Sequence, residues 1–178
     1  GYYGEIQDQT FELVSAVPET FEAMITKNPK TDTLNYWFKG AELDSLKFNF
    51  IVQDTLRTDN VQFRNPIADS LVIEKGNDGN SRLDSKFFLT SNLPIVKTDT
   101  SYVFVTNRDS ISIPFSMQVD ENNDKINIDF EILPNDQYKI NLLPNALEDF
   151  WGNTNDSLSY SVTTKKVEDF GNIFIQLI

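Results

Sequence analysis

Apolar side chains recur at every second position along most of this chain. The clearest run places Leu46, Phe48 and Phe50 on one side, with polar Lys47 and Asn49 between them. Because successive side chains of a strand point to opposite faces, this spacing predicts strands with one buried and one wet face. Helical spacing hardly occurs: only ALEDFWG at residues 146–152 is a candidate, for a single helical turn, so the expected class is all-β. Comparable alternation occurs at residues 11–15, 21–25, 34–38, 111–115, 126–130, 138–142 and 158–162.

A polar stretch, EKGNDGNSRLDSK at residues 74–86, divides these runs into two groups. Gly, Asn, Asp and Ser collect there with almost no apolar residue, as expected of a connection. Each group carries short strands at the spacing typical of an antiparallel β-sandwich. We therefore expect two tandem modules, residues 1–80 and 81–166, with one larger sandwich as the competing architecture. Residues 167–178 are expected to form a strand leading into a following domain.

Charge and composition exclude several functions. The formal net charge of −12 and the pI of about 4.3 oppose binding to nucleic acid or anionic lipid. Histidine and cysteine are absent, which removes catalytic triads, thiol nucleophiles and the usual zinc ligands. No segment approaches the ~20 consecutive apolar residues of a membrane span. These features favour a non-enzymatic protein without membrane insertion by this segment.

One triplet occurs six times: Asp, then Ser or Thr, then Leu or Ile. Its structural interpretation is a turn becoming a strand, in which Asp accepts main-chain hydrogen bonds and the aliphatic residue is the first inward side chain. The triplet beginning at Asp54 is expected at a strand end and fits this rule poorly. The triplets begin at Asp32, Asp44, Asp54, Asp69, Asp109 and Asp156.

Residues 87–165 resemble the bacterial Ig-like domains of S-layer and cell-surface proteins. The resemblance rests on the order of several pieces: FSMQVD at 115–120, Tyr138, Asp149 followed by Gly152-Asn153, and Thr163-Thr164. It implies an antiparallel Ig-like β-sandwich. The whole chain further resembles the central part of large Ig-like-domain surface proteins of the Bacteroidota, which are mostly uncharacterised.

That resemblance implies a place and a role. The place is extracytoplasmic, in the periplasm or on the outer-membrane surface, with a lipid anchor expected in the full-length protein. The role is a structural or adhesion module, acting as a rigid spacer or presenting scaffold, with other envelope proteins or surface glycans as partners. Exported proteins of these bacteria are O-glycosylated at the same triplet, which makes its hydroxyl residues candidate acceptors. They are Thr33, Ser45, Thr55, Ser70, Ser110 and Ser157.

Acidic turns offer candidate calcium ligands. DENND at 120–124 and NDGN at 77–80 carry oxygen ligands that hard cations prefer, so Asp120, Asp124 and Asp78 are the candidates. Asx-rich hairpin turns have the same composition without a metal, and this second interpretation is favoured. No other cofactor is expected.

Two tryptophans suggest a carbohydrate-binding module as the alternative function. Trp37 falls out of register with inward Tyr36 and Phe38, so its ring is a candidate sugar platform if nearby tyrosines form an exposed flat strip with it. Trp151 lies in a turn and is expected to plug the core beneath it.

Overall fold

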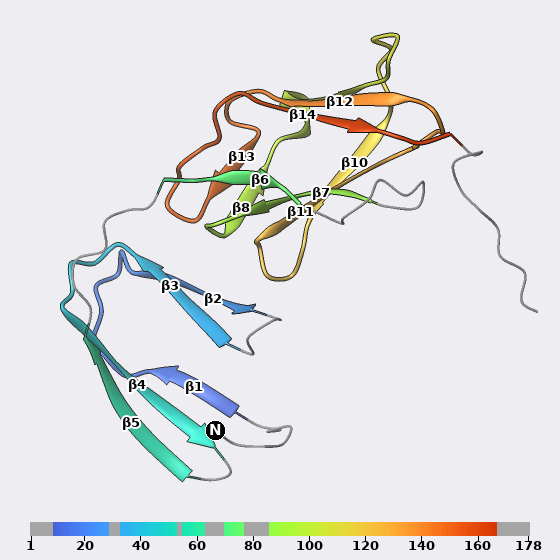
Figure 1. The fold of residues 1–178 in the computed structure, drawn as a ribbon. Helices are drawn as coiled ribbons and strands as arrows, with labels where there is room; N and C mark the ends of the chain where they lie inside the picture. The colour runs from blue at the N-terminus through green and yellow to red at the C-terminus, as the bar shows by residue number, and fades with distance from the viewer. Residues whose placement is uncertain (1–8, 29–32, 53–54, 63–69, 77–85, 167–178) are drawn as a thin grey trace, which may run out of the picture. The chain divides into compact units, whose positions relative to one another are not determined.

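The computed structural model describes residues 9–28, 33–52, 55–62, 70–76 and 86–166. These residues form β-strands and one short 3-10 helix, and every strand pair is antiparallel, which confirms the predicted all-β antiparallel class (Figure 1). The helical turn considered for residues 146–152 is wrong, because Leu147–Asp149 forms strand β13 paired with β8. The chain divides into two compact units: residues 1–25 with 34–69, and residues 26–33 with 70–178.

The first unit has a three-stranded sheet and most of a hairpin, of which residues 26–28 and Thr33 are grouped with the second unit. The sheet, in the order β1-β4-β5, consists of β1 (Gln9–Leu13), β4 (Ser45–Val52) and β5 (Thr55–Gln62). The hairpin pairs β2 (Glu22–Asn28) with β3 (Thr33–Lys39).

Aromatic rings fill the first unit. Phe11 of β1 stacks on Phe48 of β4 at 4.7 Å between ring centroids, and Tyr36 of β3 meets Phe48 edge-on at 5.0 Å. Leu46 and Phe48 are buried, as the alternation predicted. Edge-to-face and offset ring contacts of this kind add to the free energy gained from burying the rings themselves.

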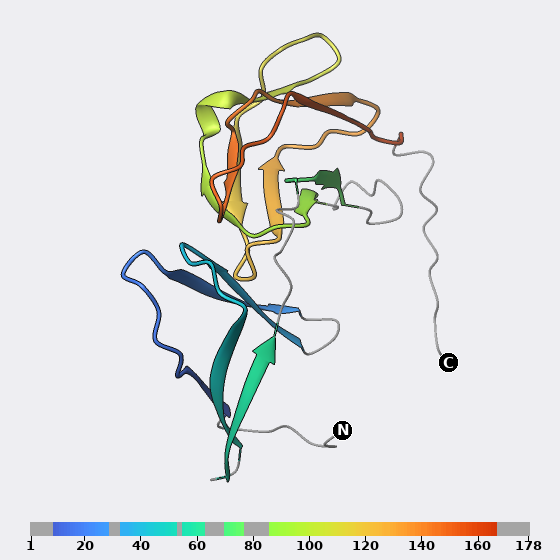
Figure 2. The same cartoon turned by 90° about the vertical axis from the view of Figure 1, so that its left-hand side faces the viewer.

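The second unit is a sandwich of two principal sheets. One has the order β10-β11-β7-β6 and the other β14-β12-β9, with the pair β13-β8 beside them and the 3-10 helix η1 (Thr100–Tyr102) ahead of β9 (Figures 1 and 2). The strands are β6 (Ile73–Lys75), β7 (Phe87–Ser91), β8 (Ile95–Thr98), β9 (Val103–Thr106), β10 (Phe115–Val119), β11 (Lys125–Phe130), β12 (Gln137–Leu142), β13 (Leu147–Asp149) and β14 (Leu158–Thr163).

Alternate side chains of these sheets form the core of the second unit. On β11, Ile126 and Ile128 are fully buried, and on β12 Tyr138, Ile140 and Leu142 face the same core. The residues between them are more exposed, so each strand has the predicted inner and outer face.

Strand β6 is the first strand that lies wholly in the second unit. Ile73 pairs with Ser91 and Lys75 with Leu89, so residues 73–75 belong to the same sheet as β7. The boundary expected after residue 80 lies outside the described residues, as does the segment 167–178 expected to lead into another domain.

We predict that Leu142→Ala destabilises the second unit by about 2–5 kcal/mol, because it removes a fully buried side chain and leaves a cavity. The neighbouring Leu143→Ala is the matched control: Leu142 is 1% exposed and Leu143 is 43% exposed. Denaturant unfolding in a Trp37→Phe background, in which Trp151 fluorescence reports the second unit, measures both. Equal losses from the two variants would contradict the assignment of the inner face.

Candidate functional site

The six triplet hydroxyls lie at different structural positions. Thr33, Ser45 and Thr55 are the first residues of β3, β4 and β5, whereas Ser157 directly precedes β14. Ser70 lies three residues before β6. Ser110 occupies a turn with a positive φ of 61°. Thr33, Ser70, Ser110 and Ser157 are exposed, Ser45 is half-buried, and the side chain of Thr55 lies outside the described residues.

The turn-to-strand interpretation of the triplets is correct only in part. Leu46 is buried, and Leu71 and Leu158 pack against the core of the second unit. Leu34, Leu56 and Ile111 are exposed, so the aliphatic residue is not consistently the first inward side chain. The triplet beginning at Asp54, expected to fit poorly, supplies the first strand residue of β5 at Thr55. The triplet at Asp109 begins no strand, because its Ser110 lies in a turn.

The acidic turn 120–124 has a structural role. The Asp120 carboxylate accepts hydrogen bonds from the main-chain N–H groups of Asp124 at 3.2 Å and Lys125 at 3.1 Å. The Asp124 carbonyl accepts from the N–H of Ser91 at 2.9 Å, which joins the turn to β7. Asp78, the third candidate calcium ligand, lies outside the described residues. Within the described residues, no group of three or more Asp, Glu, His and Cys side chains is placed to hold a metal ion.

The two tryptophans occupy different environments. Trp37 is half-buried on β3, on the face opposite Tyr36 and Phe38, which both belong to the aromatic cluster. Trp37 and Tyr36 therefore do not form one flat strip. The expectation that Trp151 plugs the core is wrong: Phe150 is buried and Trp151 is 37% exposed, with its ring edge-on to Phe150.

The turn at Asp149–Asn153 is organised around one buried carboxylate. Asp149 accepts from the N–H groups of Trp151 at 2.8 Å and Asn153 at 2.9 Å, and from the Asn153 side-chain amide at 2.8 Å. Gly152 has a φ of 88°, a conformation that side chains other than hydrogen disfavour. These contacts explain the D..GN spacing as a closed turn.

Buried Asn155, which follows β13, hydrogen-bonds to the main chain before β13 and at its first residue. Its side-chain amide donates to the carbonyls of Leu143 at 2.9 Å and Asp156 at 2.7 Å, and its side-chain oxygen accepts from the N–H of Leu147 at 2.7 Å. A buried side-chain amide is tolerated only when it is hydrogen-bonded in this way.

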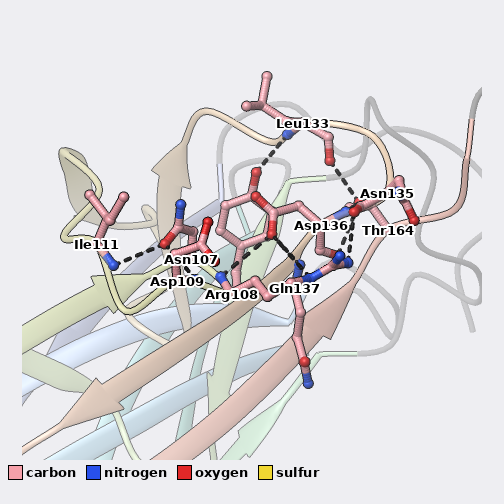
Figure 3. Close-up of polar contacts among 10 residues, drawn as sticks. Asn107, Arg108, Asp109, Ile111, Leu133, Asn135, Asp136, Gln137 and Thr164 are labelled. Carbon is pink, nitrogen blue, oxygen red and sulfur yellow. Dashed lines mark hydrogen bonds and ion pairs between the residues drawn. The ribbon is translucent and has the colours of Figure 1, made fainter.

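A second polar cluster joins loops that are distant in sequence (Figure 3). The Thr164 hydroxyl donates to the Leu133 carbonyl at 2.7 Å and accepts from the N–H of Asp136 at 2.9 Å. Arg108 donates from its guanidinium to the Asn135 carbonyl at 2.7 Å. The Asn107 side chain accepts from the N–H of Ile111 at 2.9 Å, which fixes the turn carrying Ser110. The cluster connects the end of β9, the β11–β12 loop and the end of β14.

The entry and exit strands of the second unit are tied across its two sheets. The Tyr160 hydroxyl on β14 donates to the Ile73 carbonyl on β6 at 2.9 Å. The Lys75 ammonium on β6 donates to the Ser161 carbonyl on β14, also at 2.9 Å. We call these two hydrogen bonds the β6–β14 clamp. Burial raises the pKa of Tyr160, and the nearby carboxylate of Glu74 raises it further.

The first unit contains an apolar cleft of about 260 Å3, lined by side chains from all five of its strands. Its floor includes Leu46 and Phe48, which are buried, whereas Ile25, Leu34 and Val61 are exposed and form its mouth. Among the lining side chains only Tyr36 carries a polar group, a hydroxyl whose pKa is raised by burial. The lining consists of Phe11, Ile25, Leu34, Tyr36, Phe38, Leu46, Phe48, Phe50 and Val61.

Sequence reasoning missed both the clamp and the cleft. The β-sandwich expected for residues 1–80 implies layers that close over Phe48 and Phe50, but here a three-stranded sheet packs against only a two-stranded hairpin, so the face toward β5 stays partly uncovered. The inward positions of β5 opposite Phe50 and Phe48 are Arg57 and Asp59, an ion-paired couple instead of apolar residues. That interruption of the apolar alternation is the sequence signal for an incompletely covered strand.

Comparisons with known proteins leave the family open. No protein-family model matches the sequence, and a search of curated proteins finds no match. Among the described residues, no helix has the length and hydrophobicity needed to cross a membrane.

We predict that Asp120→Ala destabilises the second unit by about 1–2 kcal/mol, because two main-chain donors lose a charged acceptor. The loss should be the same in calcium chloride and in chelator, since the carboxylate stabilises the turn without a metal. Thermal unfolding in both buffers measures it, with exposed Glu121→Ala as the control. A wild-type midpoint that rises with calcium while the Asp120→Ala midpoint does not would instead support a calcium site.

Proposed function

We propose that this chain is a non-enzymatic structural or adhesion module of an exported bacterial envelope protein, acting as a rigid spacer or presenting scaffold. The β6–β14 clamp is the observation that carries the proposal. Tension on a spacer enters one unit through its first strand and leaves through its last, and in the second unit these strands are β6 and β14. Direct bonds between them resist extension before the rest of the sandwich is loaded.

The clamp has a geometry suited to shear. The residue numbers of its two hydrogen bonds increase together on both strands: Ile73 bonds to Tyr160, and Lys75 bonds to Ser161. The two strands run in the same direction in Figure 1. Pulling β6 by its N-terminal end and β14 by its C-terminal end therefore displaces them along their length. Both hydrogen bonds are then loaded together instead of one after the other.

Packing reinforces the clamp. Phe87 of β7 lies 6.2 Å from the ring of Tyr160 between centroids, and the Lys75 ammonium lies 5.9 Å from the centroid of Phe87. These contacts limit the positions open to the two donors, so that less side-chain entropy is lost when the hydrogen bonds form. The sequence resemblance to bacterial surface proteins supports the envelope location, and exposed hydroxyls at Thr33, Ser70, Ser110 and Ser157 suit the acceptor role that it implies.

We predict that Tyr160→Phe lowers the unfolding force of the second unit and its free energy of unfolding by about 1 kcal/mol, the net value of one hydrogen bond. Single-molecule extension of the full chain between reference domains measures the force. Tyr102→Phe, at an exposed tyrosine of η1, is the matched control and should leave both quantities unchanged. An unaltered unfolding force in Tyr160→Phe would contradict the clamp.

We also predict that the second unit loses stability as pH rises above about 10. The folded-state pKa of Tyr160 is higher than the ordinary value of 10.0, so between the two values the folded state binds more protons than the unfolded state. The contribution of this pKa shift of Tyr160 to the free energy of unfolding is complete below pH 10, and it disappears as pH rises through the folded-state pKa. Denaturant unfolding between pH 8 and 11 measures this loss, which should be smaller in Tyr160→Phe. The same pH dependence in both proteins would exclude Tyr160 as its source.

A further inference from the structure

We propose that the apolar cleft of the first unit binds a small, uncharged aromatic molecule. The proposal goes beyond the structural role of the second unit and rests on different residues. Four features of the cleft support it: the composition of its lining, the exposed apolar side chains at its mouth, its volume, and the absence of positive charge in its lining.

The lining selects against polar ligands. All nine lining residues are apolar or aromatic, and Tyr36 supplies the one hydroxyl group. A polar or charged group placed there would lose its water without gaining a partner, which costs several kcal/mol in general. Five of the nine residues carry rings, and rings pack favourably edge-on or offset against another ring.

The mouth of the cleft is formed by apolar side chains that are exposed to solvent. Leu34 is 53% exposed, Ile25 is 49% exposed and Val61 is 45% exposed, and they come from three different strands around the same opening. Isolated exposed apolar residues are ordinary, but a group of them continuous with an apolar cleft is typical of a binding site.

Volume limits the size of the ligand. A cavity of about 150 Å3 in another protein takes benzene, so by proportion roughly ten non-hydrogen atoms fit a cleft of this kind. The cleft itself has a volume of about 260 Å3. A bicyclic arene meets this limit, whereas a folded protein domain does not enter such a space.

Charge disfavours anionic ligands. The chain has a formal net charge of −12, and no lining residue carries a positive charge. Arg57, whose backbone is paired with Phe50, is already ion-paired with Asp59 at 2.9 Å. A fatty acid or an aromatic carboxylate would therefore find no cation in the lining, and a neutral molecule is the better match.

The test is the binding of 1-fluoronaphthalene to the full chain, followed by 19F NMR line broadening. We expect saturable binding that weakens about tenfold or more in Leu34→Asp, because the introduced carboxylate would have to lose water beside the ligand. Leu56→Asp is the matched control: Leu56 is 61% exposed on β5, and the lining does not include it. It should bind as the wild type does. 4-Fluoro-1-naphthoate, which carries a carboxylate on the same ring system, should bind at least about tenfold more weakly than the neutral arene.

Val61→Asp, at a second exposed position of the mouth, keeps the test usable if Leu34→Asp disturbs the fold, and circular dichroism checks both variants. Absence of saturable binding by the wild type would overturn the proposal, as would equal binding by wild type and both mouth variants. Equal loss in the mouth variants and Leu56→Asp would overturn it as well. A concentration-dependent dimer that Leu34→Asp abolishes would assign the cleft to a second copy of the chain instead.

Discussion

Burial of alternate side chains between antiparallel sheets is the constraint on which the second unit depends. On β12 the inward side chains of Tyr138, Ile140 and Leu142 are removed from water, while Lys139 between them stays exposed. At about 25 cal/mol per Å2 of apolar surface, that burial is the largest favourable contribution to folding. A slip of one residue would turn the lysine inward and the three apolar side chains outward, so this alternation also fixes the strand register.

The loops at both ends of such a sandwich contain main-chain N–H and C=O groups that need hydrogen-bond partners. Buried polar side chains supply some of these partners. Asp149, Asn155 and Thr164 are buried, and each bonds to main-chain groups of the loops around it. Among the described residues, no buried side-chain nitrogen or oxygen lacks a hydrogen-bond partner. These polar groups therefore contribute to the geometry of the loops, and their conservative replacement would leave main-chain donors unpaired in a low-dielectric interior.

The alternation of apolar and polar residues predicted the strands, but it did not predict the contacts between residues that are far apart in the sequence. The alternation around Leu46, Phe48 and Ile128 correctly indicated inward positions because it depends only on neighbours along one strand. The triplet rule succeeded at Leu46 and failed at Leu56, because Leu56 pairs with Ile51 on the outer face of the sheet, opposite the face of Phe48 and Phe50. The bond between Lys75 and Ser161 spans 86 residues and follows from sheet packing, which no local spacing encodes. The apolar cleft has the same origin, since it depends on how many strands face one another.

The two units share the alternating pattern of apolar residues, but they differ in how completely their strands cover the apolar faces of one another. In the second unit the two principal sheets bury each other, and the β6–β14 clamp joins its first whole strand to its last. In the first unit five strands provide two unequal layers, and the aromatic floor around Phe48 has an opening edged by Leu34 and Val61. Apolar surface left at such an opening has a free-energy cost in water. A neutral ligand that covers it recovers part of that cost without adding charge to an already acidic chain. The proposed spacer role and the proposed ligand-binding role therefore fall to separate units of one chain, according to how completely the strands of each unit cover one another.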